Sequence, residues 1–182
     1  MSIKPKKYLQ RSWIDPRIVI KSSPIDGNGM FATSLIRRGQ KLLIWGGDLF
    51  SSEDIIAGLT IENSAVPIDE SIYIATKINS EKDDAIYTNH SCSPNIWMKD
   101  EVTFIAMTDI HPGEEITPDY CMWENNSNFK SQWRCNCGAK NCRQIITGLD
   151  WTLDNLQINY EGHFSPFINN RITKLRKASM LK

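Results

Sequence analysis

Short apolar runs separated by turn residues make up most of this chain, and few runs are long enough for a helix. Four of them are rich in β-branched and aromatic residues, which predicts strands at 18–20, 42–45, 71–74 and 102–106. Glycine, proline, asparagine and aspartate lie between them, for example in the turn expected at 109–114. Many short strands with little helix predict a mainly β protein of small sheets rather than a βαβ fold.

Helix signals are confined to three segments. Residues 51–58 begin with serines followed by two acidic residues, a common pattern at a helix start. Residues 153–160 and 166–177 also read as helices, the second with Lys and Arg in its last turns. The polar stretch 125–131, between the β-rich and helical parts, reads as a linker.

The last predicted helix carries an apolar stripe. Five apolar residues recur at helical spacing: Phe164, Phe167, Ile168, Ile172 and Leu175. We therefore expect this helix to pack back on the domain, near the functional cleft. A dimer contact or a partly frayed surface helix is the alternative.

The length and composition fit one soluble domain with an appendage. The chain has 182 residues, of which 41% are hydrophobic and 23% are charged. The basic N-terminus is not followed by an apolar segment, so we predict no secretory signal, and no apolar run approaches the length of a bilayer span. We expect an intracellular protein, cytoplasmic or nuclear, that does not contact a membrane.

The net charge of zero hides an uneven distribution of charge along the chain. Residues 1–47 carry nine Lys or Arg and two Asp or Glu. Residues 48–124 carry three Lys or Arg and sixteen Asp or Glu. Residues 125–182 are basic again, with nine Lys or Arg and three Asp or Glu. An acidic centre attracts a cationic partner, such as a lysine-rich peptide, and repels nucleic acid. The alternative is a solvated surface against which the basic ends fold.

Three of the five cysteines lie within eight residues, at Cys135, Cys137 and Cys142. An odd number of cysteines with a tight cluster favours metal ligation in a reducing compartment over a set of disulfides. Tetrahedral zinc takes four ligands, and the spacing leaves both Cys92 and Cys121 as candidates for the fourth. Three free buried thiols are the alternative.

Two polar motifs within the acidic centre carry the strongest functional signal: YTNHSCSPN at 87–95 and GEEITPDY at 113–120. Gly-Asn-Gly at 27–29 precedes them, and the cysteine cluster follows. In this order the motifs resemble the SET-domain protein-lysine methyltransferases with a post-SET zinc clip, over residues 18–150. The resemblance implies a mainly β SET-domain (β-clip) fold with short helices, several small sheets and a knot-like C-terminal threading. The zinc clip and a C-terminal helical segment follow it.

This resemblance divides the chain into four parts. They are an N-terminal basic tail at 1–15, a SET domain at 16–124, a post-SET zinc clip at 125–150 and a C-terminal helical segment at 151–182. The implied activity is transfer of methyl groups from S-adenosylmethionine to the ε-amine of protein lysine residues. The implied partner is a lysine-containing, basic protein or peptide, with no direct nucleic acid, no membrane and a monomeric state.

A cofactor loop is implied near the N-terminus. Gly27 and Gly29 flank one residue and allow close backbone approach to a ligand, although an ordinary hairpin turn is the default reading of a lone Gly-x-Gly. The resemblance assigns S-adenosylmethionine binding to six residues: Asn28, Gly29, Met30, Tyr73, Asn89 and His90. A nucleophilic Cys92 with His90 as its base is a poor rival, because residues of one turn rarely meet in the required geometry.

The resemblance makes Tyr120 the catalytic tyrosine, which orients the lysine amine toward the methyl group. The amine must lose its proton to attack, and an apolar channel lowers its pKa from about 10.4. The channel is assigned to Trp45, Tyr87 and Pro118. All three depart from the family pattern: Trp45 stands for a tyrosine, Ile86-Tyr87 for Arg-Phe, and Pro118 for an aromatic or aliphatic residue. The last position influences how many methyl groups are added.

The resemblance also selects the fourth zinc ligand. The ligands are then Cys92, Cys135, Cys137 and Cys142, and Cys121 stays free. Two alternatives remain open: a catalytically weak SET-fold module that binds cofactor or peptide, and a zinc-clip interaction protein that binds no S-adenosylmethionine. The chain lacks the cysteine-rich segment that precedes some histone-methylating SET domains, so a histone substrate is not implied.

Overall fold

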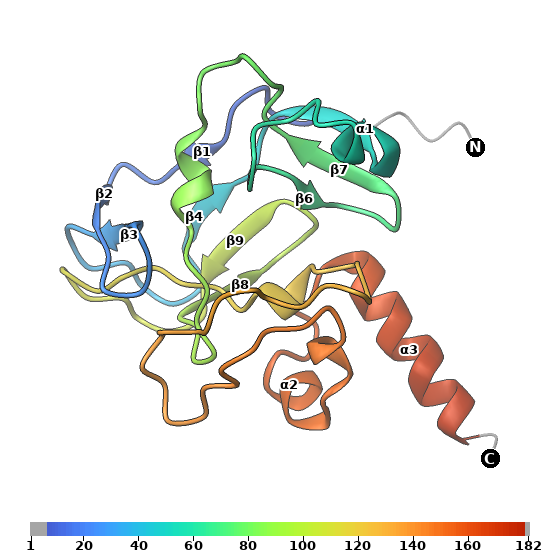
Figure 1. The fold of residues 1–182 in the computed structure, drawn as a ribbon. Helices are drawn as coiled ribbons and strands as arrows, with labels where there is room; N and C mark the ends of the chain where they lie inside the picture. The colour runs from blue at the N-terminus through green and yellow to red at the C-terminus, as the bar shows by residue number, and fades with distance from the viewer. Residues whose placement is uncertain (1–6, 181–182) are drawn as a thin grey trace.

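Small antiparallel sheets and short helices build the protein, as the sequence predicts (Figure 1). The computed structural model describes residues 7–180. The first six residues of the expected basic tail and residues 181–182 of the C-terminal segment lie outside this range. No helix within the described range is long and apolar enough to cross a membrane.

A four-stranded antiparallel sheet lies at the centre of the core. Its strands follow the order β1 (Trp13–Ile14), β4 (Lys41–Ile44), β9 (Thr103–Ala106) and β8 (Ile96–Met98). Thr103 and Phe104 are neighbours in a regular part of β9, so their side chains point to opposite faces, and both are buried. The sheet is therefore covered on both sides, which explains why its strands read as continuous apolar runs.

Two smaller sheets complete the β structure. β2 (Ile18–Ser22) and β3 (Asn28–Ala32) form a hairpin, and β5 (Asp48–Ser51), β7 (Ile72–Ala75) and β6 (Val66–Pro67) form a three-stranded sheet. Gly27 lies in the turn of the hairpin with a φ of 45°, a conformation that favours glycine. The Gly-Asn-Gly segment is thus a hairpin turn that leads directly into a strand.

The helices are short except for the last. α1 (Ser52–Ile56) begins with a capping box in which Ser51 and Asp54 exchange hydrogen bonds. Three 3-10 turns, η1 (Asp84–Tyr87), η2 (Tyr120–Met122) and η3 (Asp150–Thr152), and the short helix α2 (Asp154–Asn159) lie farther along the chain. α3 (Pro166–Met180) starts beside the sheets and ends well away from them (Figure 1).

The first half of α3 and the residues before it pack on the domain. Four apolar side chains of the expected stripe are buried in the main apolar cluster: Phe164, Phe167, Ile168 and Ile172. Leu175 is 41% exposed, so the buried stripe ends before it. The backbone N–H of Ser165 donates to the carbonyl of Met122 at 2.7 Å, which fixes the helix start beside η2.

The predicted strands and helices are confirmed. Their first and last residues differ from the predicted ones by up to three residues. The sequence does not predict β1, β3, β5, β6 and β8. β3 begins with Asn-Gly, β1 and β6 have only two residues each, and β8 is a three-residue strand that follows Ser-Pro-Asn. The expected linker at 125–131 is buried at its two ends, Asn125 and Ser131, and residues 126–128 between them are exposed.

Candidate active site

Two distant motifs lie side by side in the structure. Residues 115–120 run between strand β3 and residues 88–95. On one side the N–H of Ile116 donates to a β3 carbonyl at 2.8 Å. On the other side the N–H of Ser91 donates to the carbonyl of Pro118 at 2.9 Å. The NHSC and PDY motifs therefore form one layer, which we call the active-site layer.

Tyr120 stands at the start of η2, against the NHSC motif. Its hydroxyl donates to the backbone carbonyl of Thr88 at 2.9 Å, and its own N–H donates to Nδ1 of His90 at 3.2 Å. Asp119 caps the turn by accepting from the N–H of Cys121. Burial raises the pKa of the Tyr120 hydroxyl well above its usual value of about 10. At neutral pH this tyrosine stays protonated and acts as a hydrogen-bond donor, not as a base.

His90 is engaged within the protein through both ring nitrogens. Nδ1 accepts from the N–H of Tyr120, and Nε2 lies 3.3 Å from Sγ of Cys92. Burial lowers the pKa of His90 to about 4, so the ring is neutral at pH 7 and Nε2 carries its proton. The side chain of His90 therefore contacts Tyr120 and Cys92 within the protein.

The side chains of Cys92 and His90 do meet, contrary to the expectation for two residues of one turn. Cys92 is only 1% exposed, however, and burial raises the pKa of its thiol. Its Sγ also belongs to the four-cysteine cluster described below. A buried sulfur within such a cluster is not accessible to a substrate. The sulfur of Cys92 is therefore not placed to act as a nucleophile.

The carboxylate of Glu115 occupies the space beside Gly29. It accepts from the side-chain amide of Asn89 and from the hydroxyl of Ser23, both at 2.8 Å. A Cβ atom at position 29 would clash with this carboxylate, so the glycine is needed for the close packing. Glu115 thereby ties the β2–β3 hairpin to the NHSC motif, a role that the sequence does not reveal.

The expected cofactor residues of the hairpin turn and the NHSC motif lie together. The side-chain amide of Asn89 donates to the carbonyls of Asp26 and Asn28, each at 3.0 Å. Met30 follows in β3, but its side chain is fully buried in the core. The structure therefore brings Asn89 to the turn and directs Met30 away from any exposed surface.

Tyr73 lies on β7 of the three-stranded sheet. Its hydroxyl donates to Oδ1 of Asn125 at 3.1 Å. The side-chain amide of Asn125 donates in turn to the carbonyls of Asp69 and Glu70. Tyr73 thus connects the three-stranded sheet to the segment that follows Tyr120.

Contacts between aromatic rings connect the expected channel residue Trp45 to Tyr120 through Trp123. The centroid of the Trp45 ring lies 4.9 Å from that of Trp123, which lies 5.2 Å from that of Tyr120. Of the other two expected channel residues, Pro118 is buried and Tyr87 is partly exposed. The two tryptophan rings place an apolar wall beside the tyrosine.

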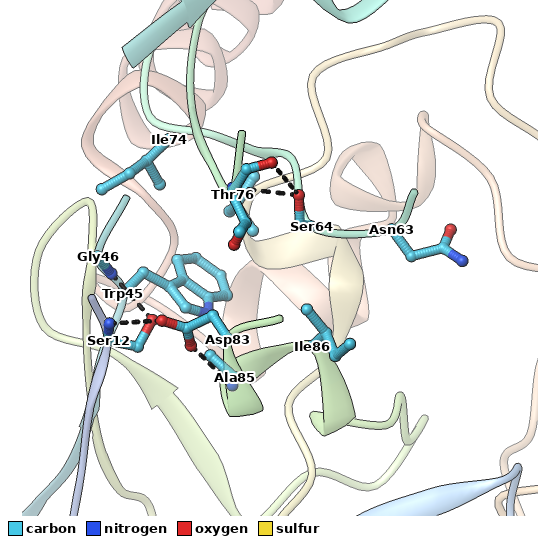
Figure 2. Close-up of a pocket in the computed structure, with 11 residues that line it drawn as sticks. Ser12, Trp45, Gly46, Asn63, Ser64, Ile74, Thr76, Asp83, Ala85 and Ile86 are labelled. Carbon is cyan, nitrogen blue, oxygen red and sulfur yellow. Dashed lines mark hydrogen bonds between the residues drawn. The ribbon is translucent and has the colours of Figure 1, made fainter. Parts of the chain in front are cut away.

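A small pocket opens beside Trp45 (Figure 2). Asp83 fixes one wall by accepting from the N–H of Ser12 at 2.8 Å, and the hydroxyl of Ser64 accepts from the N–H of Thr76. The cavity holds about 30 Å³, which is enough for a water molecule and not for a cofactor. None of its lining residues belongs to the hairpin turn or the NHSC motif, so it is separate from the expected cofactor site.

Four cysteines form a cluster that fits zinc. The Sγ atoms of Cys92, Cys135, Cys137 and Cys142 all lie within 4.8 Å of one another. Tetrahedral zinc with Zn–S bonds of about 2.3 Å needs sulfur atoms about 3.8 Å apart, so small shifts suffice. Burial opposes ionisation of Cys137, but backbone N–H groups that donate to its sulfur lower its pKa to about 7. Cys121 is buried outside the cluster.

A buried ion pair joins this cluster to the tyrosine. Arg143 follows Cys142, and its guanidinium donates to both carboxylate oxygens of Asp119 at 2.7 Å. Its Nε donates to Asp150 at 2.8 Å. A bidentate pair fixes two segments relative to each other, and Asp119 directly precedes Tyr120. The sequence contains both charges, but nothing in it predicts their pairing.

A family model for the SET domain matches residues 27–121, more than half of the chain. The chain belongs to the SET-domain family. This SET protein is similar to the histone-lysine N-methyltransferase trithorax of Drosophila virilis, with 26% identity over 137 residues. It is also similar to histone-lysine N-methyltransferase 2B of Homo sapiens, with 27% identity over 137 residues. Both matches cover 68% of this chain but only 3% and 5% of the relatives, so it spans a small part of their length.

Solved structures share the fold of this SET protein. One is KRYPTONITE in complex with mCHG DNA and SAH, with a TM-score of 0.55 and 24% identity over 70% of this chain and 28% of that chain. Another is the methyltransferase domain of human SETMAR, with a TM-score of 0.54 and 18% identity over 69% and 55% of the two chains. The predicted family and mainly β fold are confirmed, and the cysteine cluster fits a post-SET zinc site.

Proposed function

We propose that this SET protein transfers methyl groups from S-adenosylmethionine to the ε-amine of protein lysine residues. The observation that carries the proposal is the active-site layer, in which Tyr120 is hydrogen-bonded to both Thr88 and His90. Relatives that match two thirds of the chain are named histone-lysine N-methyltransferases, which supports the same chemistry here. A solved structure of the same fold contains SAH.

We assign cofactor binding to the hairpin turn and the NHSC motif. When bound, S-adenosylmethionine supplies a methyl group that its sulfonium makes electrophilic. Residues 27–29 present backbone groups at the turn, and the side chain of Asn89 holds that turn in place. Trp133 is 45% exposed, with its ring centroid 6.4 Å from that of His90, so it offers a flat face to an aromatic ring of the cofactor. Sequence reasoning missed Trp133, whose only signal is its place just before the cysteine cluster.

Tyr120 acts by orienting the reacting amine. Its raised pKa keeps the hydroxyl protonated, so the lysine must lose its extra proton to water rather than to this residue. The carbonyl of Thr88 already holds the hydroxyl, which fixes its direction before the substrate binds. Trp45 and Trp123 place apolar surface next to the tyrosine, and such surroundings favour the neutral amine over the ammonium.

We propose that one structural zinc ion is held by Cys92, Cys135, Cys137 and Cys142. When bound, the ion supplies a rigid cross-link. Cys92 belongs to the NHSC motif and the other three ligands to the clip, so these thiolates anchor the clip against the active-site layer. Metal affinity of this kind is coupled to folding of the segment that provides the ligands.

We propose that the substrate is a basic, lysine-containing protein segment and that the enzyme is intracellular. The acidic centre of the chain favours a cationic segment, and the names of the relatives point to histones as one such substrate. We also propose that the protein is a monomer. Light scattering in solution tests the monomeric state.

The Tyr120→Phe variant tests the proposed activity. Loss of the hydroxyl removes an orienting contact of the transition state, so we expect methyl transfer to fall about 100-fold or more. Affinity for S-adenosylmethionine should stay unchanged, because the hydroxyl is bonded to Thr88 and is not assigned to the cofactor. Radiolabelled S-adenosylmethionine with a mixed protein extract measures transfer, and calorimetry measures affinity.

Three other results have distinct meanings. Full transfer by Tyr120→Phe contradicts the catalytic role of the tyrosine. Cofactor binding without transfer by the unchanged protein favours a SET-fold module that only binds cofactor or peptide. Zinc content without S-adenosylmethionine binding favours a zinc-clip interaction protein.

A further inference from the structure

A carboxylate without a partner lies at the proposed cofactor turn. Asp26 directly precedes the Gly-Asn-Gly segment, and it is exposed. Its backbone carbonyl accepts from the side-chain amide of Asn89 at 3.0 Å. Its carboxylate, in contrast, takes part in no hydrogen bond or ion pair with another residue of the described range. Asp26 therefore places a negative charge at the turn that is available to a ligand.

Contacts to two neighbouring residues bring Asp26 and Tyr120 close to each other. Asn89 binds the carbonyl of Asp26, and the residue before it, Thr88, accepts from the hydroxyl of Tyr120 at 2.9 Å. Burial raises the pKa of this hydroxyl, and the negative charge of Asp26 raises it further. The electric field of the Asp26 carboxylate thus acts on the group at which we place the reaction.

Two other charged side chains near this turn are already engaged. The ammonium of Lys21, on β2, lies over the ring of Phe31 at 4.2 Å from its centroid. The carboxylate of Glu115 accepts from the hydroxyl of Ser23 at 2.8 Å. Lys21 is therefore not paired with Asp26, and Asp26 is the carboxylate of this turn that is open to a cation.

The cofactor and its product differ by one positive charge. On transfer, the bond between sulfur and the methyl carbon breaks, the bond from that carbon to the lysine nitrogen forms, and the positive charge passes from sulfur to nitrogen. S-adenosylhomocysteine (SAH) is left with a neutral sulfur. Because we propose that Tyr120 orients the amine toward the methyl group, the sulfur belongs near its hydroxyl. A carboxylate whose field acts there attracts S-adenosylmethionine more strongly than SAH.

We propose that Asp26 is a specificity residue of the cofactor site, and that its charge favours S-adenosylmethionine over SAH. This inference rests on the proposed function, because it requires cofactor binding at residues 27–29 and methyl transfer at Tyr120. It adds a means to limit inhibition by the product, since the attraction to Asp26 weakens once the methyl group has left. The turn itself does not require the charge, because asparagine suits turns as well as aspartate does.

The Asp26→Asn variant of the full, zinc-loaded chain tests this proposal, because it removes the charge and keeps the size of the side chain. Calorimetry with S-adenosylmethionine and with SAH gives the ratio of the two affinities. We expect this ratio to fall about threefold or more in low salt. The difference between the variant and the unchanged protein should shrink in about 0.5 M salt, which screens an exposed charge. In steady-state assays KM for S-adenosylmethionine should rise while kcat changes little.

Asp48→Asn is the matched control and should keep the affinity ratio of the unchanged protein. Asp48 is exposed on β5, outside the turn and the active-site layer, and its carboxylate also has no partner among the residues that the structure describes. Asp26→Glu keeps the charge and should keep most of the preference for S-adenosylmethionine. Unfolding temperatures show whether the variants are folded, and Asp26→Ser, which also suits a turn, replaces Asp26→Asn if that variant is not.

Three results would overturn the proposal. An unchanged affinity ratio in folded Asp26→Asn contradicts the role of Asp26 and leaves the proposed function intact. An equal fall of the ratio in Asp48→Asn shows that net charge alone is responsible. If the unchanged protein binds neither S-adenosylmethionine nor SAH, the proposed function and this inference are both wrong.

Discussion

Asp119 is a fully buried carboxylate that accepts from Arg143, from the hydroxyl of Tyr160 and from the backbone of Cys121. It directly precedes Tyr120, so the contacts that neutralise its charge also hold the proposed catalytic residue. Arg143 follows the last cysteine of the clip. The clip therefore provides the countercharge for the active-site layer in addition to a metal cross-link.

Arg143→Gln leaves the carboxylate of Asp119 buried without its countercharge. We expect the free energy of unfolding to fall by about 3–5 kcal/mol. Methyl transfer should fall as well, even where the variant is folded, because the segment that carries Tyr120 loses its anchor. Denaturant unfolding of the zinc-loaded protein measures the first effect, and an activity assay under native conditions measures the second.

Arg37→Gln is the control for this variant. Arg37 also pairs with an aspartate, Asp109, at 2.8 Å, but both side chains are exposed. Exposed ion pairs contribute little to stability, so this variant should unfold like the unchanged protein. Equal losses in Arg37→Gln and Arg143→Gln would contradict the importance of burial.

From the sequence alone, the resemblance of the motifs leads to Tyr120 and Asn89, and the spacing of three cysteines leads to the clip. Neither Arg143 nor Glu115 is found in this way, because contacts between residues distant in the sequence leave no local pattern in a single sequence. Glu115 even lies within the GEEITPDY motif, yet its bonds to Ser23 and Asn89 appear only when the hairpin is placed beside that motif.

At the level of elements, β-branched and aromatic runs predict strands where both faces are buried, as in β4 and β9. β3 is missed because its first residues, Asn28 and Gly29, are typical of turns. Its strand conformation is supported by tertiary pairing with β2 on one side and with Glu115 on the other. Pairing of this kind is a property of the folded chain and not of the segment.

The clip is expected to bind one zinc ion per chain. Cys135→Ser removes a ligand, so zinc content should fall to near zero, and the clip should become sensitive to proteases because metal binding is coupled to folding. Elemental mass spectrometry measures the zinc content, and limited proteolysis measures the loss of structure.

Cys121→Ser is the matched control for the ligand assignment. Cys121 is as buried as Cys92, but its sulfur lies outside the four-cysteine cluster. This variant should therefore keep its full zinc content. If Cys121→Ser lost the metal while Cys92→Ser kept it, the ligand set inferred from the resemblance would be incorrect.

On the scale of the whole molecule, α3 contributes to the core. Ile168 is fully buried in the main apolar cluster. Ile168→Ala should lower the free energy of unfolding by about 2–5 kcal/mol, because it removes buried apolar surface and leaves a cavity. Denaturant unfolding measures the change.

Ile158→Ala in α2 is the corresponding control. Ile158 is 71% exposed, so the same substitution should change the free energy of unfolding by no more than about 0.5 kcal/mol. A small change in Ile168→Ala would show that α3 is a dispensable appendage, and a truncation ending at Asp150 would then leave thermal stability unchanged.

The helical spacing of apolar residues predicts that α3 packs on the domain, but not where its packing ends. Leu175 fits the same spacing as Ile172 and is nevertheless 41% exposed. The C-terminal end of α3 extends away from the other elements (Figure 1). How much surface those elements offer to the helix cannot be read from the spacing of its own apolar residues.

Synthesis on the ribosome sets the order in which these parts become available. A chain emerges from its N-terminus, and a domain folds once enough of it has been made. Residues 88–95 and 115–120 can meet early, but the carboxylate of Asp119 has no countercharge until Arg143 has emerged, and the start of α3 follows later still. We therefore expect the nascent chain to complete its active-site layer only after the clip and the start of α3 have emerged. A premature stop codon in the clip would then abolish the activity altogether rather than shorten an otherwise working enzyme.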